Sequence, residues 1–162
     1  MTMKTKIGWW LVAGMLGLAA NLSDATAGEQ INVHGIACYA KNGAQQGDLE
    51  YVPAGVRVKA GIVPREIACA VARTSPITGP DGLGFFVDGS NNFSQTTSCT
   101  IYSYDFTGSF LGSAQFSSTS ANYDNFLSLP PANTPGFAYI GMICTIPGNT
   151  NGTMRGVTVF DL

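Results

Sequence analysis

Apolar and polar side chains alternate along most of the chain from residue 31 onward, and no long segment shows the period of an amphipathic helix. Turn-forming residues, mainly Gly, Ser, Thr, Asn and Pro, interrupt this alternation about every eight to twelve positions. Short alternating segments between turns are typical of strands. The pattern predicts strands at residues 31–39, 49–52, 55–60, 65–73, 84–88, 96–104, 109–117, 125–129, 137–146 and 154–161.

These strands predict an all-β fold in which two antiparallel sheets pack face to face, as in immunoglobulin-like or jelly-roll-like β-sandwiches. Successive side chains of a strand point to opposite faces of its sheet, so every second position is expected to face the core. We expect residues 28–162 to form a single sandwich domain, because that length is sufficient to bury a core.

The first residues of the chain have the three parts of a cleavable secretory signal. Lys4 and Lys6 give a positive start, residues 7–20 form an apolar run, and Ala25 and Ala27 provide the small residues of a signal-peptidase site. The apolar run is shorter than the roughly 20 residues that span a bilayer, which disfavours the alternative of a membrane anchor. We therefore expect residues 1–27 to be removed, and the mature protein to be secreted, periplasmic or at the cell surface.

Charge is sparse and slightly acidic, with 8 basic and 10 acidic residues and a formal net charge of −2. Nucleic-acid binding requires clustered Lys and Arg, which the sequence does not have. The same lack of basic clusters argues against electrostatic attachment to a membrane once the signal is removed. The charge pattern therefore argues against both nucleic-acid and membrane partners.

The four cysteines, Cys38, Cys69, Cys99 and Cys144, are an even number in an exported protein, which predicts two disulfides. Spacing alone allows more than one pairing. Strand alternation places the last three cysteines among apolar core positions, and we favour Cys38–Cys69 with Cys99–Cys144. A metal site is the alternative, but the chain has no C-x-x-C motif and only one histidine, so the ligand spacing is poor.

No catalytic constellation is visible in the sequence. His34 is the only histidine, and no G-x-S-x-G motif is present, which argues against a serine or cysteine hydrolase. Asp48 and Glu50 share one face of a predicted strand, and a pair of carboxylates can hydrolyse glycosides. A small secreted hydrolase is therefore a third possibility, and an ordinary solvated strand face is the alternative explanation of the pair.

Calcium is the cofactor that the sequence allows most readily. Asp88, Ser90 and Asn92 place oxygen-bearing side chains at alternate positions in a predicted loop, and Ca²⁺ prefers oxygen ligands from such loops. An Asp/Asn/Gly turn without a metal explains the same residues. We therefore expect no cofactor, with calcium as the one that the sequence would allow.

Two surfaces are candidates for binding. Tyr102 and Tyr104 share the strand face opposite the predicted core face, where two rings in a row could stack on sugars or on a protein. Packing against aromatic residues of a neighbouring strand is the alternative. Pro130, Pro131 and Pro135 stiffen a long loop, which loses little entropy when it docks and therefore suits a protein partner.

The alternating segment Ile31-x-Val33-x-Gly35, followed by Cys38, resembles the N-terminal extension of chaperone–usher pilus subunits. The resemblance implies strand donation to a neighbouring subunit and a structural, fimbria-like role. The sequence as a whole favours a different function, an exported non-enzymatic module that binds a carbohydrate or a protein surface. The fimbria-like subunit is the alternative.

Overall fold

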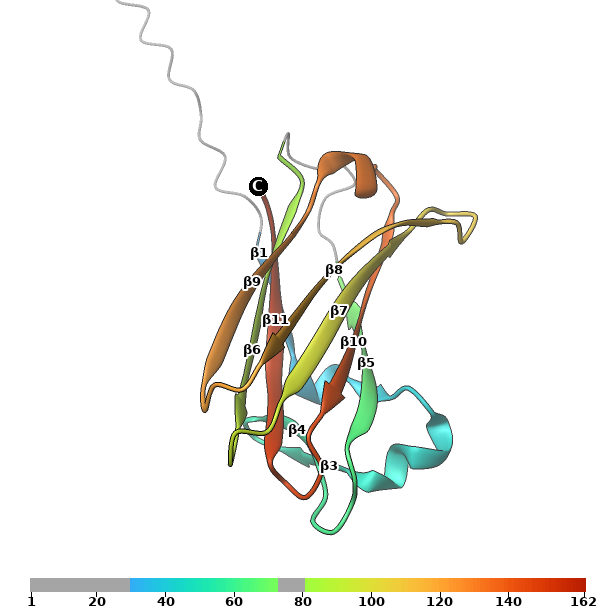
Figure 1. Cartoon of the computed structure of the whole chain (residues 1–162). Coiled ribbons are helices and arrows are strands. Elements are labelled where there is room, and N and C mark those ends of the chain that lie inside the picture. The colour runs from blue at the N-terminus through green and yellow to red at the C-terminus, as the bar shows by residue number, and fades with distance from the viewer. Residues whose placement is uncertain (1–29, 73–80) are drawn as a thin grey trace, which may run out of the picture.

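The computed structural model describes residues 30–72 and 81–162, which form a sandwich of two antiparallel sheets (Figure 1). The predicted all-β sandwich is therefore confirmed. The predicted signal sequence and most of the turn-rich link between strands 65–73 and 84–88 lie outside the described residues.

The six-stranded sheet has the order β3-β4-β11-β6-β9, and β1 also pairs with β11. Its strands are β1 (Gln30–His34), β3 (Leu49–Val52), β4 (Gly55–Val58), β6 (Leu83–Asn91), β9 (Tyr123–Leu129) and β11 (Gly152–Asp161).

The five-stranded sheet has the order β2-β5-β10-β7-β8. Its strands are β2 (Tyr39–Ala40), β5 (Arg65–Val71), β7 (Thr97–Tyr104), β8 (Phe110–Ser118) and β10 (Tyr139–Ile146). Short 3-10 turns connect the elements at η1 (Gly35–Ala37), η2 (Gly43–Asp48) and η3 (Pro131–Asn133).

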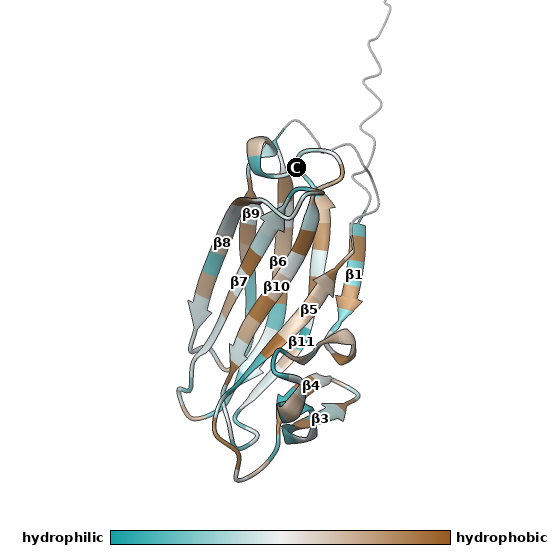
Figure 2. Cartoon of the chain, turned by 90° about the vertical axis from the view of Figure 1, so that its right-hand side faces the viewer, coloured by the Kyte–Doolittle hydropathy of each residue, from teal (hydrophilic) through white to brown (hydrophobic). Residues whose placement is uncertain are grey.

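The core lies between the two sheets and is built from the alternate positions of each strand (Figure 2). On the longest central strands the inward side chains are almost completely buried, including Phe85, Ile101, Met142 and Ile146. The intervening side chains face solvent. The outward positions of each sheet are consequently free to carry a function without disturbing the core.

Both predicted disulfides form, Cys38–Cys69 and Cys99–Cys144. Cys99 and Cys144 lie directly opposite each other on the neighbouring strands β7 and β10. Cys38 precedes β2 and reaches Cys69 on the adjacent strand β5. Both cross-links therefore join neighbouring segments of the five-stranded sheet, and all four cysteines are buried on the side that faces the core.

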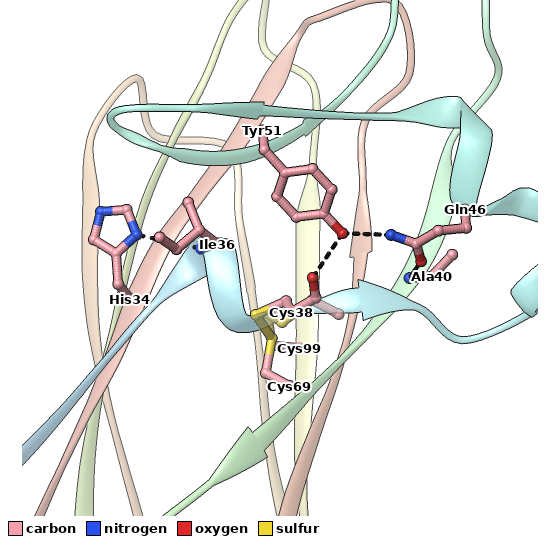
Figure 3. Close-up of a disulfide and its surroundings, with 9 residues drawn as sticks. His34, Ile36, Cys38, Ala40, Gln46, Tyr51, Cys69 and Cys99 are labelled. Carbon is pink, nitrogen blue, oxygen red and sulfur yellow. Dashed lines mark hydrogen bonds between the residues drawn. A yellow bond between two sulfur atoms is a disulfide. The ribbon is translucent and has the colours of Figure 1, made fainter.

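A chain of hydrogen bonds fixes the segment around the Cys38–Cys69 disulfide (Figure 3). The Tyr51 hydroxyl on β3 donates to the Cys38 carbonyl at 2.9 Å, and the Gln46 side-chain amide donates to that hydroxyl at 2.6 Å. The Gln46 side-chain oxygen in turn accepts from the Ala40 N–H at 2.8 Å. One edge of the five-stranded sheet is thereby tied to the β3–β4 hairpin.

The prediction of one strand at residues 31–39 is wrong in its second half, where η1 interrupts the chain between β1 and β2. A Cβ on Gly35 would collide with the carbonyl oxygen of Met154, so the chain can approach β11 closely only with glycine here. The His34 ring helps to start the turn, because its Nδ1 accepts a hydrogen bond from the Ile36 N–H. β1 itself pairs with β11 of its own chain.

Candidate functional site

The outer face of the five-stranded sheet carries the tyrosines that the sequence singled out. Tyr102 and Tyr104 alternate with the buried Ile101 and Ser103 on β7, so their rings point away from the core. Their ring centroids lie 6.4 Å apart with an interplanar angle of 27°. The side chain of Tyr104 is 38% exposed.

Aromatic residues of the two flanking strands continue this row. Phe110, on β8, packs edge-on against Tyr104 with centroids 5.8 Å apart and is 58% exposed. Tyr139, on β10, lies opposite Tyr104 in the register and is 65% exposed. Tyr104 thus makes a cross-strand ring contact with Phe110 and remains open to solvent, whereas Tyr102 is half-buried, so packing and binding are compatible explanations of this pair. We call Tyr102, Tyr104, Phe110 and Tyr139 the aromatic face.

Next to the aromatic face the sheet surface is open and nearly free of charge. Gly141 lies opposite Tyr102, and a Cβ added there would meet no atom within 4 Å. The neighbouring outward positions carry hydroxyl or amide groups at Ser98, Thr100, Ser113, Gln115, Ser117 and Thr145, and apolar side chains at Ala68, Ala70 and Ile143. The charged residue on this part of the sheet, Glu66, forms an ion pair with Lys41 at 2.9 Å. The surface therefore offers stacking and neutral hydrogen bonds.

The proline loop lies at the same end of the sandwich as the aromatic face. Pro130, Pro131 and Pro135 are exposed around η3. A Cβ on Gly112 of β8 would collide with the side chain of Asn133, which shows that the loop packs closely on that strand. Because Gly112 is buried and lies opposite the inward Ser103, the loop packs on the core-facing side of β8, whereas the aromatic face lies on the outer side of the sheet.

The outer face of the six-stranded sheet has a second group of aromatic rings, which the sequence analysis missed. The ring centroid of Phe86 lies 5.4 Å from that of Phe160, with the rings stacked, and 5.4 Å from that of Phe126, with the rings tilted. Strand alternation could have identified Phe86 as an outward residue, because it directly follows the inward Phe85.

The residues proposed to bind calcium do not form the predicted loop. Asp88 and Ser90 lie within β6, which extends to Asn91, and Asn92 follows directly after it. That part of the prediction is wrong because β6 continues its pairing with β11 as far as Asn91. The predicted calcium site depended on a loop around these residues, and a strand occupies that place instead. In residues 30–72 and 81–162, no three His, Cys, Asp or Glu side chains are grouped so that they could hold a metal ion.

Asp88 instead faces a second carboxylate. It lies directly opposite Asp124 on β9 and beside a hollow of ≈ 390 Å³, whose lining includes Asn32, His34 and Arg155. Partial burial, followed by the charge of Asp124 and a hydrogen bond with it, raises the pKa of the Asp88 carboxyl. Arg155 opposes this shift, but its guanidinium also donates to the Asn122 side-chain oxygen at 3.0 Å.

Asp88→Asn is expected to stabilise the protein at pH 7. A carboxyl whose folded-state pKa is raised favours the folded state when protonated, and this stability is lost as the pH rises through the folded-state pKa. Like charges directly opposite each other destabilise a sheet, and removing one should add about 0.2–1 kcal/mol at pH 7, the magnitude typical of a cross-strand pair. The gain should vanish near pH 3, as measured by urea unfolding at both pH values.

Asp105→Ala provides the contrasting control. Hydrogen bonds from the Thr107 hydroxyl and the Ser109 and Thr107 N–H groups lower the pKa of Asp105, so its charged form stabilises the β7–β8 turn. This variant should lose stability at pH 7. A loss of stability in Asp88→Asn at pH 7 would contradict the inference that the charges of Asp88 and Asp124 destabilise the folded protein.

The two carboxylates considered for hydrolysis are held apart by separate partners. Asp48 lies at the end of η2 and accepts from Arg65 at 2.7 Å, whereas Glu50 on β3 accepts from Arg57 at 2.8 Å. The expectation that both belong to one strand face is therefore wrong, because the strand begins only at Leu49. Their ion pairs serve the local structure of the β3–β4 hairpin.

No helix in the described part of the chain is both long and apolar enough to cross a bilayer.

No family model matches the sequence, and no curated protein is significantly similar to it. Among solved structures, a xylan-binding module, CBM15, aligns with a TM-score of 0.52 at 11% identity, covering 82% of this chain and 96% of that chain. The CBM36-1 domain of a multidomain xylanase, from the hindgut metagenome of Trinervitermes trinervoides, aligns with a TM-score of 0.48 at 7% identity, covering 81% and 96%. The alignment with the xylan-binding module shows a shared sandwich fold.

Proposed function

We propose that this protein is an exported, non-enzymatic module that binds neutral glycans on the outer face of its five-stranded sheet. The observation that carries the proposal is the aromatic face, which places four rings on three adjacent strands; Tyr104, Phe110 and Tyr139 are exposed and Tyr102 is half-buried beside Tyr104. Aromatic rings combine a large apolar surface with, for tyrosine, a hydroxyl that can form hydrogen bonds. Sugar rings have apolar C–H faces and hydroxyl edges that match both properties.

Charge supports a neutral ligand. The outward residues around the aromatic face are hydroxyl-bearing, amide or apolar, the last including Ile143, and Glu66 is neutralised by Lys41. A uronic-acid polymer would find no cationic partner among these outward residues. The shared fold with a protein named as a xylan-binding module is consistent with glycan binding but does not identify the ligand.

The test is isothermal titration of the oxidised protein with soluble neutral polysaccharides, such as xylan and glucomannan, and with the anionic polygalacturonate. We expect binding to at least one neutral polymer that depends little on salt, since no ion pair is involved. Binding to the anionic polymer alone would contradict the proposal. Failure to bind any of these polymers would contradict glycan binding and favour a protein partner for the same face.

Gly141→Thr tests the place of binding by filling the open space beside Tyr102. A Cβ added at this position meets no atom within 4 Å, and a β-branched residue suits a strand better than glycine. We expect at least about a ten-fold loss of glycan affinity, which corresponds to roughly 1.4 kcal/mol, with an unchanged or higher Tm. The measurements are isothermal titration and thermal unfolding.

Gly43→Thr is the matched control, because a Cβ there also meets nothing within 4 Å and Gly43 lies in η2, away from the aromatic face. It should bind glycan as the wild type does. Equal affinity in the wild type and Gly141→Thr would show that the ligand does not lie over Gly141.

A further inference from the structure

Two phenylalanines have a backbone conformation that bulky residues rarely adopt. Phe93 has φ of 55° and Phe137 has φ of 68°, both in the left-handed region. Their exposed fractions, 85% and 77%, are the highest among the exposed large hydrophobic residues in the described part of the chain. Burial of the phenyl ring therefore offsets little of the backbone strain at either position.

The turn that contains Phe137 shows why the strain is unusual. The Ala138 N–H donates to the Pro135 carbonyl at 3.0 Å, which closes a four-residue turn with Phe137 in its third position. A positive φ in that position favours glycine or asparagine. The glycine of this turn, Gly136, stands one position too early to supply it. The chain thus has a phenyl group where the local backbone favours a glycine.

The location of Phe137 suggests what the ring does. Phe137 precedes by two residues Tyr139, the first residue of β10, and Tyr139 lies opposite Tyr104 in the aromatic face. Phe93 lies in the turn between β6 and β7, at the opposite end of β7 from Tyr104. The two strained phenylalanines are therefore alike in backbone and exposure, but only Phe137 adjoins the aromatic face.

We infer that Phe137 is a ligand-contact residue that extends the aromatic face beyond the end of β10, so that the module binds an oligosaccharide chain in preference to a single sugar or a disaccharide. This inference rests on the proposed function. Strained backbone conformations cluster at functional sites, and of the two strained phenylalanines it is Phe137 that stands beside the aromatic face. In this arrangement the rings on the sheet hold one part of the chain, and Phe137 holds the next sugars along it.

The experiment compares Phe137→Asn and Phe137→Tyr with the matched control Phe93→Asn. Asparagine accepts the left-handed backbone, so both asparagine variants should raise the Tm by about 2–4 °C. Phe137→Asn should weaken binding to the neutral polysaccharide about ten-fold while leaving the affinity for the corresponding disaccharide unchanged. Phe137→Tyr keeps the ring and should bind both as the wild type does, and Phe93→Asn should also leave both affinities unchanged.

The outcomes separate the inference from the function on which it rests. If the wild type binds a neutral polysaccharide and Phe137→Asn binds it equally well, the inference is wrong and the proposed function stands. A lower Tm in Phe137→Asn would show that packing, and not ligand binding, accounts for the ring. If the wild type binds none of the glycans tested, both are overturned, because Phe137 would then have no glycan to contact.

Discussion

Replacing Cys99 and Cys144 together by alanine is expected to cost about 4 kcal/mol of folding free energy, the largest stability effect of any change considered for this protein. The two residues are 45 apart in sequence, and a cross-link that closes such a loop restricts the unfolded chain by about this amount. For a domain of this size the Tm should fall by about 10 °C or more. Both side chains are buried in the core, so a small cavity adds to the loss.

Thermal unfolding followed by circular dichroism would measure this loss, with Cys38→Ala/Cys69→Ala as the comparison. That pair closes a shorter loop, with a separation of 31, and should cost slightly less. A reducing agent added to the wild type should bring its Tm below that of either double variant. An unchanged Tm in the Cys99/Cys144 variant would mean that the central strands β7 and β10 hold their register through hydrogen bonds and packing alone.

Replacing Tyr102 and Tyr104 together by alanine is expected to reduce glycan affinity at least about a hundred-fold, the largest effect on binding. Exposed aromatic residues that fill the centre of an interface commonly contribute about 2 kcal/mol or more each. Tyr102 also supports the ring of Tyr104, whose partner in turn is Phe110. The fold should survive, because both rings lie on the outer side of the sheet, and the Tm should fall by only a few degrees.

Isothermal titration with the neutral polysaccharide that the wild type binds provides the measurement. Phe86→Ala/Phe126→Ala is the matched control, since it removes an aromatic pair from the outer face of the other sheet. That variant should keep full affinity. The reverse result, with binding lost in the Phe86/Phe126 variant and kept in the Tyr102/Tyr104 variant, would move the site to the six-stranded sheet.

Strand alternation carried most of the information about the fold. The segments around Arg65–Val71 and Thr97–Tyr104 alternate clearly, and their predicted bounds differ from the observed ones by at most two residues at either end. The failures lie where a long-range contact overrides the local pattern. Gly35 breaks the first predicted strand because the chain must pass close to Met154, and β6 continues through Gly89 and Ser90 because β11 pairs with it. Neither contact is visible in the local sequence.

The candidate site was only partly predictable for the same reason. Tyr102 and Tyr104 are close in sequence and share a face by alternation, so the sequence identified them. Phe110 and Tyr139 join them only through the order in which β10, β7 and β8 pair, which the sequence alone does not specify. Phe137 depends on a backbone angle, and a phenylalanine after glycine in a turn gives no sign of it.

Both disulfides cross-link the sheet that carries the aromatic face, and neither joins the two sheets. The disulfides therefore do not restrain motions that slide one sheet over the other. They do restrain the separation of β7 from β10 and of the β2 segment from β5. The spacing of the rings is set before any ligand arrives, so little conformational entropy remains to be lost on binding. A binding module of the proposed kind would gain affinity from such preorganisation without any additional contact.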